Sequence, residues 1–362
     1  MSADYTGGAS AELVAIGAAY YNAYMPWKMI GHEWAVEHLR QHIQRGQLRH
    51  AYLLTGPDSV GKETLALRLA QALLCQEPAS APCADCRACL QVVDGVHPDL
   101  HLVEAEEVDG TLKVEQVREL QRQIALTPYE GGRRVVIIRR AHEMSSGAAN
   151  ALLKTLEEPP PQVVLALAAR SPESLLPTIV SRCEQLGLRP VPVDVIQAAL
   201  SAEFGAERAQ LLACLSAGRP GLAITLGRDE QALAGRRQSL DALFEALQAN
   251  RTDRFAYVKE LMPGRDRTLD RRRCLDELQV WLSFWRDVML TSFGAGVAAA
   301  NIDEWRRIQR IGQAITPAAA AGAVNALQGA LVAVSRNANL QLAMETALLD
   351  LPQLSRQLAS AE

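Results

Sequence analysis

The segment AYLLTGPDSVGKE (residues 51–63) decides the fold class of this chain. It opens with an apolar run as long as a buried strand, and the residues after Lys62 place a leucine at every fourth position, as a helix does. The loop between them has the spacing G-x4-G-K, which is typical of a phosphate-binding loop. Glycines in such a loop let backbone N–H groups point at phosphate oxygens at the start of a helix. Gly56, Gly61 and Lys62 are therefore candidate nucleotide-binding residues.

The position after Lys62 departs from the pattern of a hydrolysing loop. Glu63 stands where a serine or threonine would hold Mg²⁺, and Thr64 comes one residue late. Hydrolysis also needs a carboxylate at the end of a later apolar strand, but that predicted strand ends in Arg139 and Arg140. A guanidinium group neither ligates a cation nor accepts a proton at ordinary pH. The sequence leaves open whether the loop holds ATP and Mg²⁺, and it argues against hydrolysis.

Apolar strands alternate with amphipathic helices from residue 30 to about residue 190. The predicted strands are 51–55, 101–103, 134–138 and 163–168. This alternation predicts an α/β fold with a mostly parallel sheet that helices cover on both faces. After Pro190 the strand signals disappear and apolar residues keep helical spacing to the end of the chain. The carboxy-terminal part is therefore expected to be all helical.

The overall composition is that of a globular protein. The 362 residues carry a net charge of −4 and are 49% apolar and 22% charged, which excludes a disordered chain and a protein that coats nucleic acid. No run approaches the ~18 apolar residues that a membrane helix needs, because Arg, Asp or Gln breaks the longest candidates, so we expect no membrane-spanning role. The first basic residue is Lys28, so the positive head of a secretory signal is missing. We expect a cytoplasmic protein.

Four of the seven cysteines fall within fifteen residues: Cys75, Cys83, Cys86 and Cys89. In a long chain without a secretory signal, such clustering points to a metal site and not to disulfides. Four thiolates suffice for a closed tetrahedral site, so structural Zn²⁺ is favoured. An iron–sulfur cluster is the alternative, but no fourth cysteine follows Cys89 at the ferredoxin spacing. His97 is a spare ligand candidate, more typical of an ordinary loop residue.

Several further motifs occur in a fixed order along the chain. They are IGH (30–32), HAYLLTGP (50–57), the four cysteines, ANALLKTLEEPP (149–160), LPTI (176–179) and SRC (181–183). In this order they resemble the delta-prime subunits of the bacterial DNA polymerase III clamp loader, a family of the AAA+ superfamily. The resemblance is specific up to about residue 190 and looser beyond it.

The resemblance implies a domain organisation. Residues 25–190 would form an AAA+ P-loop core with a zinc module at 75–89 inserted in it. Residues 191–235 would form a small helical lid, and residues 236–362 an all-helical collar domain for oligomerisation. Residues 1–24 would be an amino-terminal tail, for which Met25 is an alternative start of translation.

The resemblance also assigns a role to the SRC motif. In that family the arginine of this motif points into the ATP site of the neighbouring gamma/tau subunit, and Arg182 matches it, between Ser181 and Cys183. A guanidinium group in that place stabilises charge on the transferring phosphoryl group. The alternative is that Arg182 caps the sheet edge or pairs with Glu184. A further departure is Gly221, which stands where a second sensor arginine is expected, although Arg219 is near.

These losses, together with a retained Arg182, predict a stator that completes a neighbour's site and does not hydrolyse ATP. Its expected partners are the gamma/tau and delta subunits and, through the complex, the sliding clamp and primer-template DNA. A gamma/tau-like ATPase is the first alternative. The second is a stand-alone DNA-binding AAA+ protein, for which the candidate residues are Arg133, Arg134, Arg139, Arg140, Arg265, Arg267, Arg271, Arg272 and Arg273.

Overall fold

The computed structural model describes most of the chain, in two compact units. The described residues are 27–106, 110–130, 132–262, 264, 267–296, 299–336, 338–355 and 358, with 267 and 268 described by backbone only. The units are Met1–Ala209 with Gly218–Leu222, and Gln210–Ala217 with Ala223–Glu362. The predicted tail and the alternative start at Met25 lie outside the described residues. The division into core, lid and collar stays a prediction.

The first unit contains a five-stranded sheet in which all strand pairs are parallel. Its strands are β1 (Ala51–Thr55), β2 (Leu100–Val103), β3 (Arg134–Ile138), β4 (Val163–Ala169) and β5 (Glu184–Gly187). Their order is β2-β3-β4-β1-β5. Every residue of β1, β3 and β4 is buried, as expected of apolar runs in a sheet that is covered on both faces. The predicted parallel α/β architecture is confirmed.

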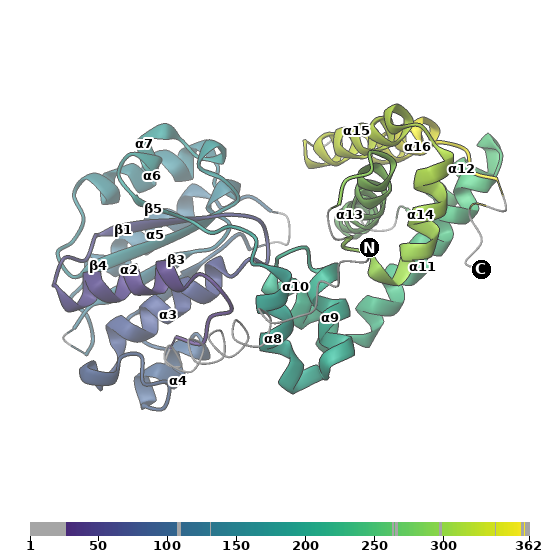
Figure 1. Ribbon diagram of the computed structural model, residues 1–362. Helices are drawn as coiled ribbons and strands as arrows, with labels where there is room; N and C mark the ends of the chain where they lie inside the picture. Colours follow the sequence, from purple (N-terminus) through teal and green to yellow (C-terminus); the bar gives the residue numbers. More distant parts are fainter. Residues whose placement is uncertain are drawn as a thin grey trace. The chain divides into compact units, whose positions relative to one another are not determined.

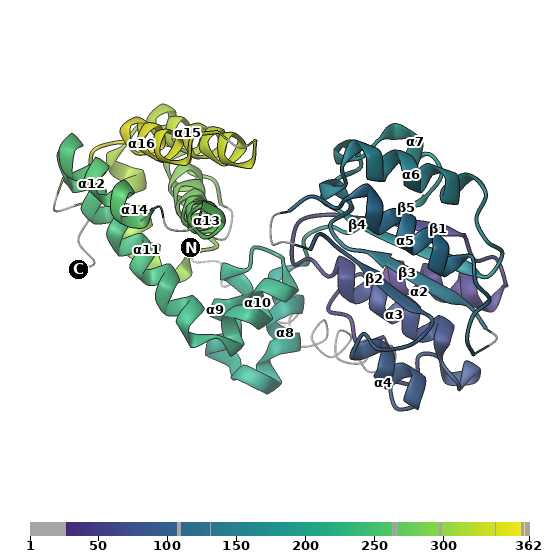
Figure 2. The same cartoon turned by 180° about the vertical axis from the view of Figure 1, so that it is seen from behind.

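Helices cover both faces of this sheet (Figures 1 and 2). They are α2 (Glu33–Gln44), α3 (Lys62–Leu74), α4 (Arg87–Val93), α5 (Val114–Ile124), α6 (Ser146–Glu157) and α7 (Pro177–Val180), with short 3-10 turns at Pro78–Ser80, Ala141–Glu143 and Pro172–Ser174. Buried side chains of α2 and α3 pack with Leu54 and Val135 on one face. Those of α5, α6 and α7 pack with Leu53 and Val136 on the other. Adjacent strand residues point to opposite faces, so each strand serves both cores.

Three helices follow the sheet: α8 (Val193–Phe204), α9 (Ala206–Leu215) and α10 (Pro220–Arg228). The first residues of α10 belong to the first unit and its later residues to the second. The remaining helices are α11 (Glu230–Gln248), α12 (Arg251–Leu261), α13 (Arg267–Ser292), α14 (Trp305–Ala314), α15 (Pro317–Ser335) and α16 (Leu340–Asp350), with a 3-10 turn at Ile302–Glu304. The described part after Pro190 contains no strand, as predicted.

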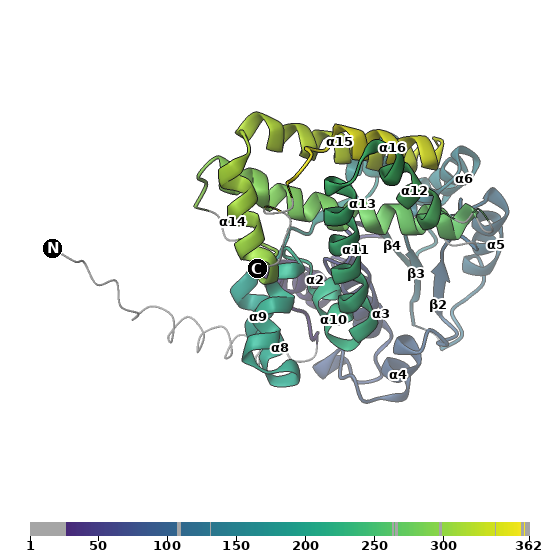
Figure 3. The ribbon, with the colours of Figure 1, turned by 90° about the vertical axis from the view of Figure 1, so that its right-hand side faces the viewer.

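The core of the second unit forms around α13, which packs against α15 (Figure 3). Trp281 and Trp285 are fully buried on one face of α13, at the helical spacing that the sequence shows. Phe284 meets Phe244 of α11 edge to face, with ring centroids 5.1 Å apart. Met344 of α16 is buried in the same cluster. The all-helical prediction is confirmed for this unit.

Among the described residues, α15 is the one helix that is long and apolar enough to cross a membrane by length and composition. This differs from the expectation that no segment reaches that length, because alanines and a few polar uncharged residues extend the apolar stretch. Ala323 and Leu327 of α15 are fully buried in the core of the second unit. Core helices of globular proteins pass the same test, so α15 is weak grounds for a membrane span.

Candidate functional site

The phosphate-loop motif lies in the structural context that the sequence predicts. β1 ends at Thr55, and α3 begins at Lys62 with Gly61 as its amino-terminal cap. The backbone at Gly56 has a φ of 140°, and a Cβ there would lie 2.3 Å from the carbonyl oxygen of Leu188. Only glycine fits this position, because both the backbone conformation and the close approach exclude a side chain.

The Lys62 side chain is turned onto the loop itself. It is 9% exposed, and its Nζ donates hydrogen bonds to the carbonyl oxygens of Gly56 at 2.6 Å and Pro57 at 2.7 Å. The carboxylate of Asp58 lies 3.9 Å from Nζ. Burial lowers the pKa of Lys62, while the charges of Asp58 and Glu63 raise it. The ammonium group is therefore satisfied by the loop without a bound phosphate.

Glu63 and Arg139 form an ion pair with each other. In a hydrolysing site these two positions carry magnesium ligands. Arg139 Nε lies 3.4 Å from Glu63 Oε2, and its Nη1 lies 3.4 Å from Glu104 Oε2. Arg139 directly follows β3, so it reaches the first turn of α3 from the carboxyl edge of the sheet. Thr64 lies on the exposed side of α3. A guanidinium–carboxylate pair thus takes the place of a cation and its ligands.

Basic side chains surround the loop residue Asp58. Arg170, directly after β4, contacts its Oδ2 through Nε and Nη2, both at 3.0 Å. Burial and the charge of Arg170 lower the pKa of His142 to about 4. Burial also lowers the pKa of Arg219, while the charge of Asp58 raises it. The sequence did not single out Arg170 or His142. The sequence could have indicated both residues, because each follows an apolar strand and the carboxyl ends of parallel strands meet at one edge of the sheet.

Gly221 contacts the phosphate loop through its backbone. Its N–H donates to the carbonyl oxygen of Ser59 at 2.9 Å, and a Cβ at this position would lie 2.9 Å from the same oxygen. A sensor arginine at position 221 would have to displace the loop. At the position where the resemblance predicts that arginine, the backbone of Gly221 contacts the backbone of Ser59 instead.

Arg182 lies just beyond the carboxy-terminal end of α7. Its Nη2 pairs with Glu157 of α6 at 2.8 Å, and its Nη1 donates to the carbonyl oxygen of Thr178 at 2.9 Å. The alternative prediction of a pair with Glu184 is wrong: Glu184 turns instead toward α2, where it pairs with His38. The Arg182 side chain is 34% exposed. The guanidinium group is therefore fixed near the surface and still accessible.

The four clustered cysteines come together around one point. Cys75 caps the end of α3, Cys86 caps the start of α4, and Cys89 lies in the first turn of α4. The Sγ of Cys75 lies 3.6 Å from that of Cys83 and 3.9 Å from that of Cys86, and Cys83 Sγ lies 3.9 Å from Cys89 Sγ. Four sulfurs bound to one tetrahedral Zn²⁺ at ~2.3 Å would be about 3.8 Å apart. The four residues fit a metal ion.

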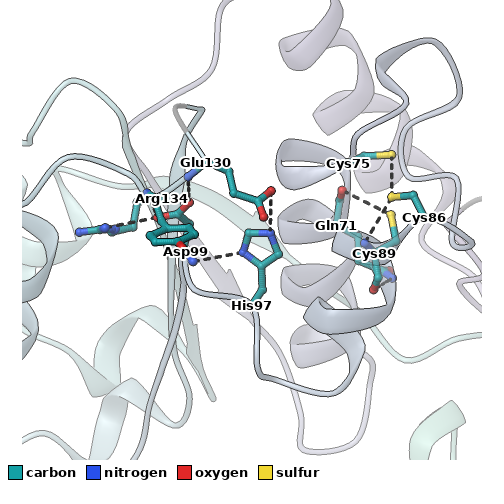
Figure 4. A network of polar contacts seen from close by, with 9 residues as sticks. Gln71, Cys75, Cys86, Cys89, His97, Asp99, Glu130 and Arg134 are labelled. Atoms are coloured by element: carbon teal, nitrogen blue, oxygen red, sulfur yellow. Dashed lines mark hydrogen bonds and ion pairs between the residues drawn. The ribbon is translucent and has the colours of Figure 1, made fainter.

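Backbone hydrogen bonds also reach the sulfurs of the cluster. Backbone N–H groups donate to the sulfurs of Cys75, Cys83 and Cys86 at 3.3–3.5 Å. Burial raises the pKa of the Cys86 thiol, but hydrogen bonds from backbone donors and from the neighbouring cysteines outweigh burial and lower this pKa to about 7. Burial raises the pKa of the Cys75 and Cys89 thiols. Figure 4 shows the sulfurs of Cys75, Cys86 and Cys89 facing one another, with Gln71 beside Cys89.

His97 is not part of this cluster. Its Nδ1 accepts a hydrogen bond from the backbone N–H of Asp99 at 3.1 Å, and its Nε2 lies 3.8 Å from Glu130 (Figure 4). It belongs to a polar group in which Asp99 also pairs with Arg134 at 3.3 Å. The interpretation of His97 as a loop residue is the one that the structure supports.

Several arginines that suggested DNA binding make internal contacts. Arg134 is buried and pairs with Asp99, and Arg140 pairs with Glu143 at 3.2 Å. Arg271 donates to two carbonyl oxygens at the end of α15, at 2.6 and 3.0 Å. The side chains of Arg265 and Arg267 lie outside the described residues. These three arginines are therefore less available to bind DNA phosphates than their number in the sequence suggests.

Comparisons with known proteins identify the family. A family profile described as DNA polymerase III, delta subunit, matches residues 31–192. The DNA polymerase III subunit delta' of Bacillus subtilis (strain 168) is 31% identical over 313 residues, which cover 86% of this chain and 93% of that protein. The chain belongs to the DNA polymerase III subunit delta-prime family. The resemblance that the sequence shows to this family is confirmed, and so is the predicted α/β fold class with its parallel sheet.

Other delta-prime relatives align over shorter stretches. The protein of Pseudomonas aeruginosa is 44% identical over 182 residues, 49% of this chain and 55% of that protein. The protein of Escherichia coli (strain K12) is 39% identical over 193 residues, 52% of this chain and 58% of that protein. This chain thus matches little more than half the length of these two delta-prime proteins. Among solved structures, a DNA polymerase III gamma subunit-related protein of Thermotoga maritima aligns over 86% of this chain and 97% of that chain, at 19% identity and a TM-score of 0.40.

Proposed function

We propose that this chain is a non-hydrolysing stator subunit of the bacterial DNA polymerase III clamp loader. The ion pair between Glu63 and Arg139, 3.4 Å apart, carries the proposal. A hydrolysing P-loop site has a hydroxyl and a carboxylate at these places, and both ligate Mg²⁺. Here the two side chains neutralise each other, and the guanidinium group repels a cation. The chain therefore lacks the means to hold the metal on which phosphoryl transfer depends.

The position of Lys62 supports the same conclusion. A P-loop lysine acts by reaching the terminal phosphates of the nucleotide. In this chain its ammonium group is held by Gly56 and Pro57, with Asp58 close by. A nucleotide would have to break two short hydrogen bonds before it gained this contact. Weak or absent nucleotide binding follows, so the loop's role is to link β1 to α3.

Arg182 is the residue that we assign to the neighbouring site. As a trans-acting arginine finger, flanked by Ser181 and Cys183, it would enter the ATP site of a gamma/tau subunit and stabilise charge on the transferring phosphoryl group, an effect worth ~10³ or more in rate. Its contacts with Glu157 and Thr178 hold the guanidinium group in one place. Leaving the partly exposed Glu157 costs only about 0–1 kcal/mol, so docking against a phosphate is favourable.

The proposed partners follow from the family. Gamma/tau would lie at the Arg182 face and delta elsewhere on the ring, with the helices of the second unit joining the assembly. The sliding clamp and primer-template DNA would be contacted through the complex, in the cytoplasm. The internal pairing of Arg134, Arg140 and Arg271 supports this indirect route over tight DNA binding by the chain alone.

The cysteine cluster has a structural part in this proposal. Cys75, Cys83, Cys86 and Cys89 would hold Zn²⁺, which would supply a closed tetrahedral link between the end of α3 and the start of α4. All four sulfurs would be used, so no position would be left for a substrate. The module would stabilise the segment after α3 without taking part in ATP chemistry.

The test uses the loader reconstituted with gamma/tau and delta. Arg182→Ala should leave assembly intact and lower the ATP turnover that clamp and primed DNA stimulate, by roughly tenfold or more. Arg182→Lys should restore little, because an ammonium group lacks the planar fork of the guanidinium. Arg189→Ala, which removes another exposed arginine of the same unit, is the control and should change nothing. Unchanged turnover in Arg182→Ala would refute the finger.

The gamma/tau-like ATPase remains a second candidate, because the G-x4-G-K spacing is intact and Arg170 adds positive charge near the loop. On that reading the purified chain would hydrolyse ATP with Mg²⁺, and Lys62→Ala would abolish the activity. Absence of turnover and of binding of a fluorescent ATP analogue would eliminate it.

A further inference from the structure

A second group of metal-ligating side chains lies between α2 and β5. His38 and His42 are four residues apart on α2, which places both imidazoles on one face of the helix, with ring centroids 4.2 Å apart. Glu184, the first residue of β5, faces them. His38 Nε2 lies 2.5 Å from Glu184 Oε1, and His42 Nδ1 lies 3.6 Å from Glu184 Oε2. One ligand atom from each residue can be chosen so that all lie within 4.8 Å of one another.

The carboxylate of Glu184 is held in this place with one oxygen incompletely satisfied. Oε2 is buried and has no hydrogen-bond partner among the described residues. Its neighbours are His42 Nδ1 and the Nε of Arg49, at 3.6 and 3.4 Å. A buried carboxylate oxygen that makes only such long contacts is incompletely compensated for the water that it has lost. A cation shared with the two imidazoles would satisfy it.

We infer that His38, His42 and Glu184 form a binding site for a divalent transition-metal ion, separate from the cysteine cluster. Two neutral imidazoles and one carboxylate are the donors that suit Zn²⁺, Ni²⁺ or Co²⁺, whereas four thiolates select zinc more strongly. Three protein ligands leave at least one coordination position for water or a further group.

Two neighbouring residues set the affinity of this site. The hydroxyl of Tyr52 forms a 3.1 Å hydrogen bond with His42 Nδ1 and accepts another from the backbone N–H of Arg49. Metal binding at Nδ1 exchanges this hydrogen bond for a coordinate bond. The guanidinium of Arg49 competes with the metal for Glu184, but its side chain is 68% exposed and can turn into solvent at little cost.

The experiment titrates Ni²⁺ into the full chain at pH 7.5 by calorimetry, with zinc content measured before and after. We expect one Ni²⁺ per chain, with a Kd on the order of micromolar and no release of zinc. His38→Ala and Glu184→Gln should each weaken binding by roughly tenfold or more. Glu37→Gln changes a carboxylate on α2 outside the site and is the matched control, which should bind as the parent does.

Arg49→Ala should have the opposite effect to the ligand substitutions. It should tighten Ni²⁺ binding severalfold, because it removes the guanidinium group that competes with the metal for Glu184. The inference is overturned if the parent chain binds no Ni²⁺, if binding displaces zinc, or if His38→Ala and Arg49→Ala both bind as the parent does. In these cases Glu184 serves only as an ion-pair partner that ties α2 to β5.

Discussion

The phosphate loop and the cysteine cluster lie at opposite ends of the same helix, α3, and they differ in how completely their ligand sets are kept. The cluster keeps all four thiol groups, with sulfurs spaced as a tetrahedral ion requires. The loop keeps its glycines and Lys62, but oppositely charged residues stand where magnesium ligands would be. Backbone shape and ligand chemistry are therefore separate properties of a site. The phosphate loop has the backbone shape of a nucleotide-binding loop but not the side chains that bind magnesium.

The strongest test of this comparison removes one ligand from the cluster. Cys86→Ser should abolish zinc binding and lower the melting temperature by roughly 10 °C, since a closed structural site contributes directly to folding. Metal analysis and thermal unfolding measure both effects. Cys214→Ala, at a buried cysteine of the other unit, should keep its zinc. A zinc-free parent protein that is as stable as the zinc-loaded one would break the comparison.

A smaller effect is expected when the shape of the phosphate loop is changed. Gly56→Ala should destabilise the first unit by about 2–4 kcal/mol, because the new Cβ combines a disfavoured φ with a clash against the Leu188 carbonyl. Gly46→Ala is the matched control: its φ is +65° but nothing lies within 4 Å, so only the backbone cost of ~1 kcal/mol remains. Urea unfolding measures the free energy of unfolding of both variants. If both lose the same amount, the close approach of Gly56 to the Leu188 carbonyl oxygen does not contribute to stability.

The smallest expected effect comes from giving the loop its magnesium ligands back. Glu63→Thr combined with Arg139→Asp should make the affinity for a fluorescent ATP analogue depend on Mg²⁺, by about tenfold or ~1.4 kcal/mol. Neither substitution alone should do so, because each leaves one ligand missing. Titrations with Mg²⁺ and with EDTA measure the difference. The same affinity in both solutions would mean that the contacts of Lys62, and not the missing ligands, prevent binding.

The sequence predicts much of this molecule because the decisive patterns are local. Strand β1, the phosphate loop and α3 are contiguous in the sequence. The runs of β3 and β4 are apolar throughout, and such strands bury both of their faces only inside a sheet that is covered on both sides. The cysteine cluster could be predicted for the same reason, since its four residues lie within one short segment. The helical face of α13 with Trp281 and Trp285 follows from spacing alone.

The residues that the sequence did not reveal come from distant segments. The pair between Arg139 and Glu63 could not be read from the chain, although each departure was visible separately. The contact of Arg170 with Asp58 joins residues 112 positions apart, and that of His38 with Glu184 joins residues 146 positions apart. Such pairs depend on strand order, which a linear pattern does not specify.

The sequence by itself determined the α/β class, the phosphate loop with its departures, and the four residues of the cysteine cluster, because hydrophobic period and short-range spacing fix local structure. Only the tertiary structure decided what those departures mean. The order β2-β3-β4-β1-β5 brings the ends of β3 and β4 beside the loop and places Glu184 against α2. Charges that are separate along the chain therefore neutralise one another in space, and that neutralisation depends on distances that only the fold sets.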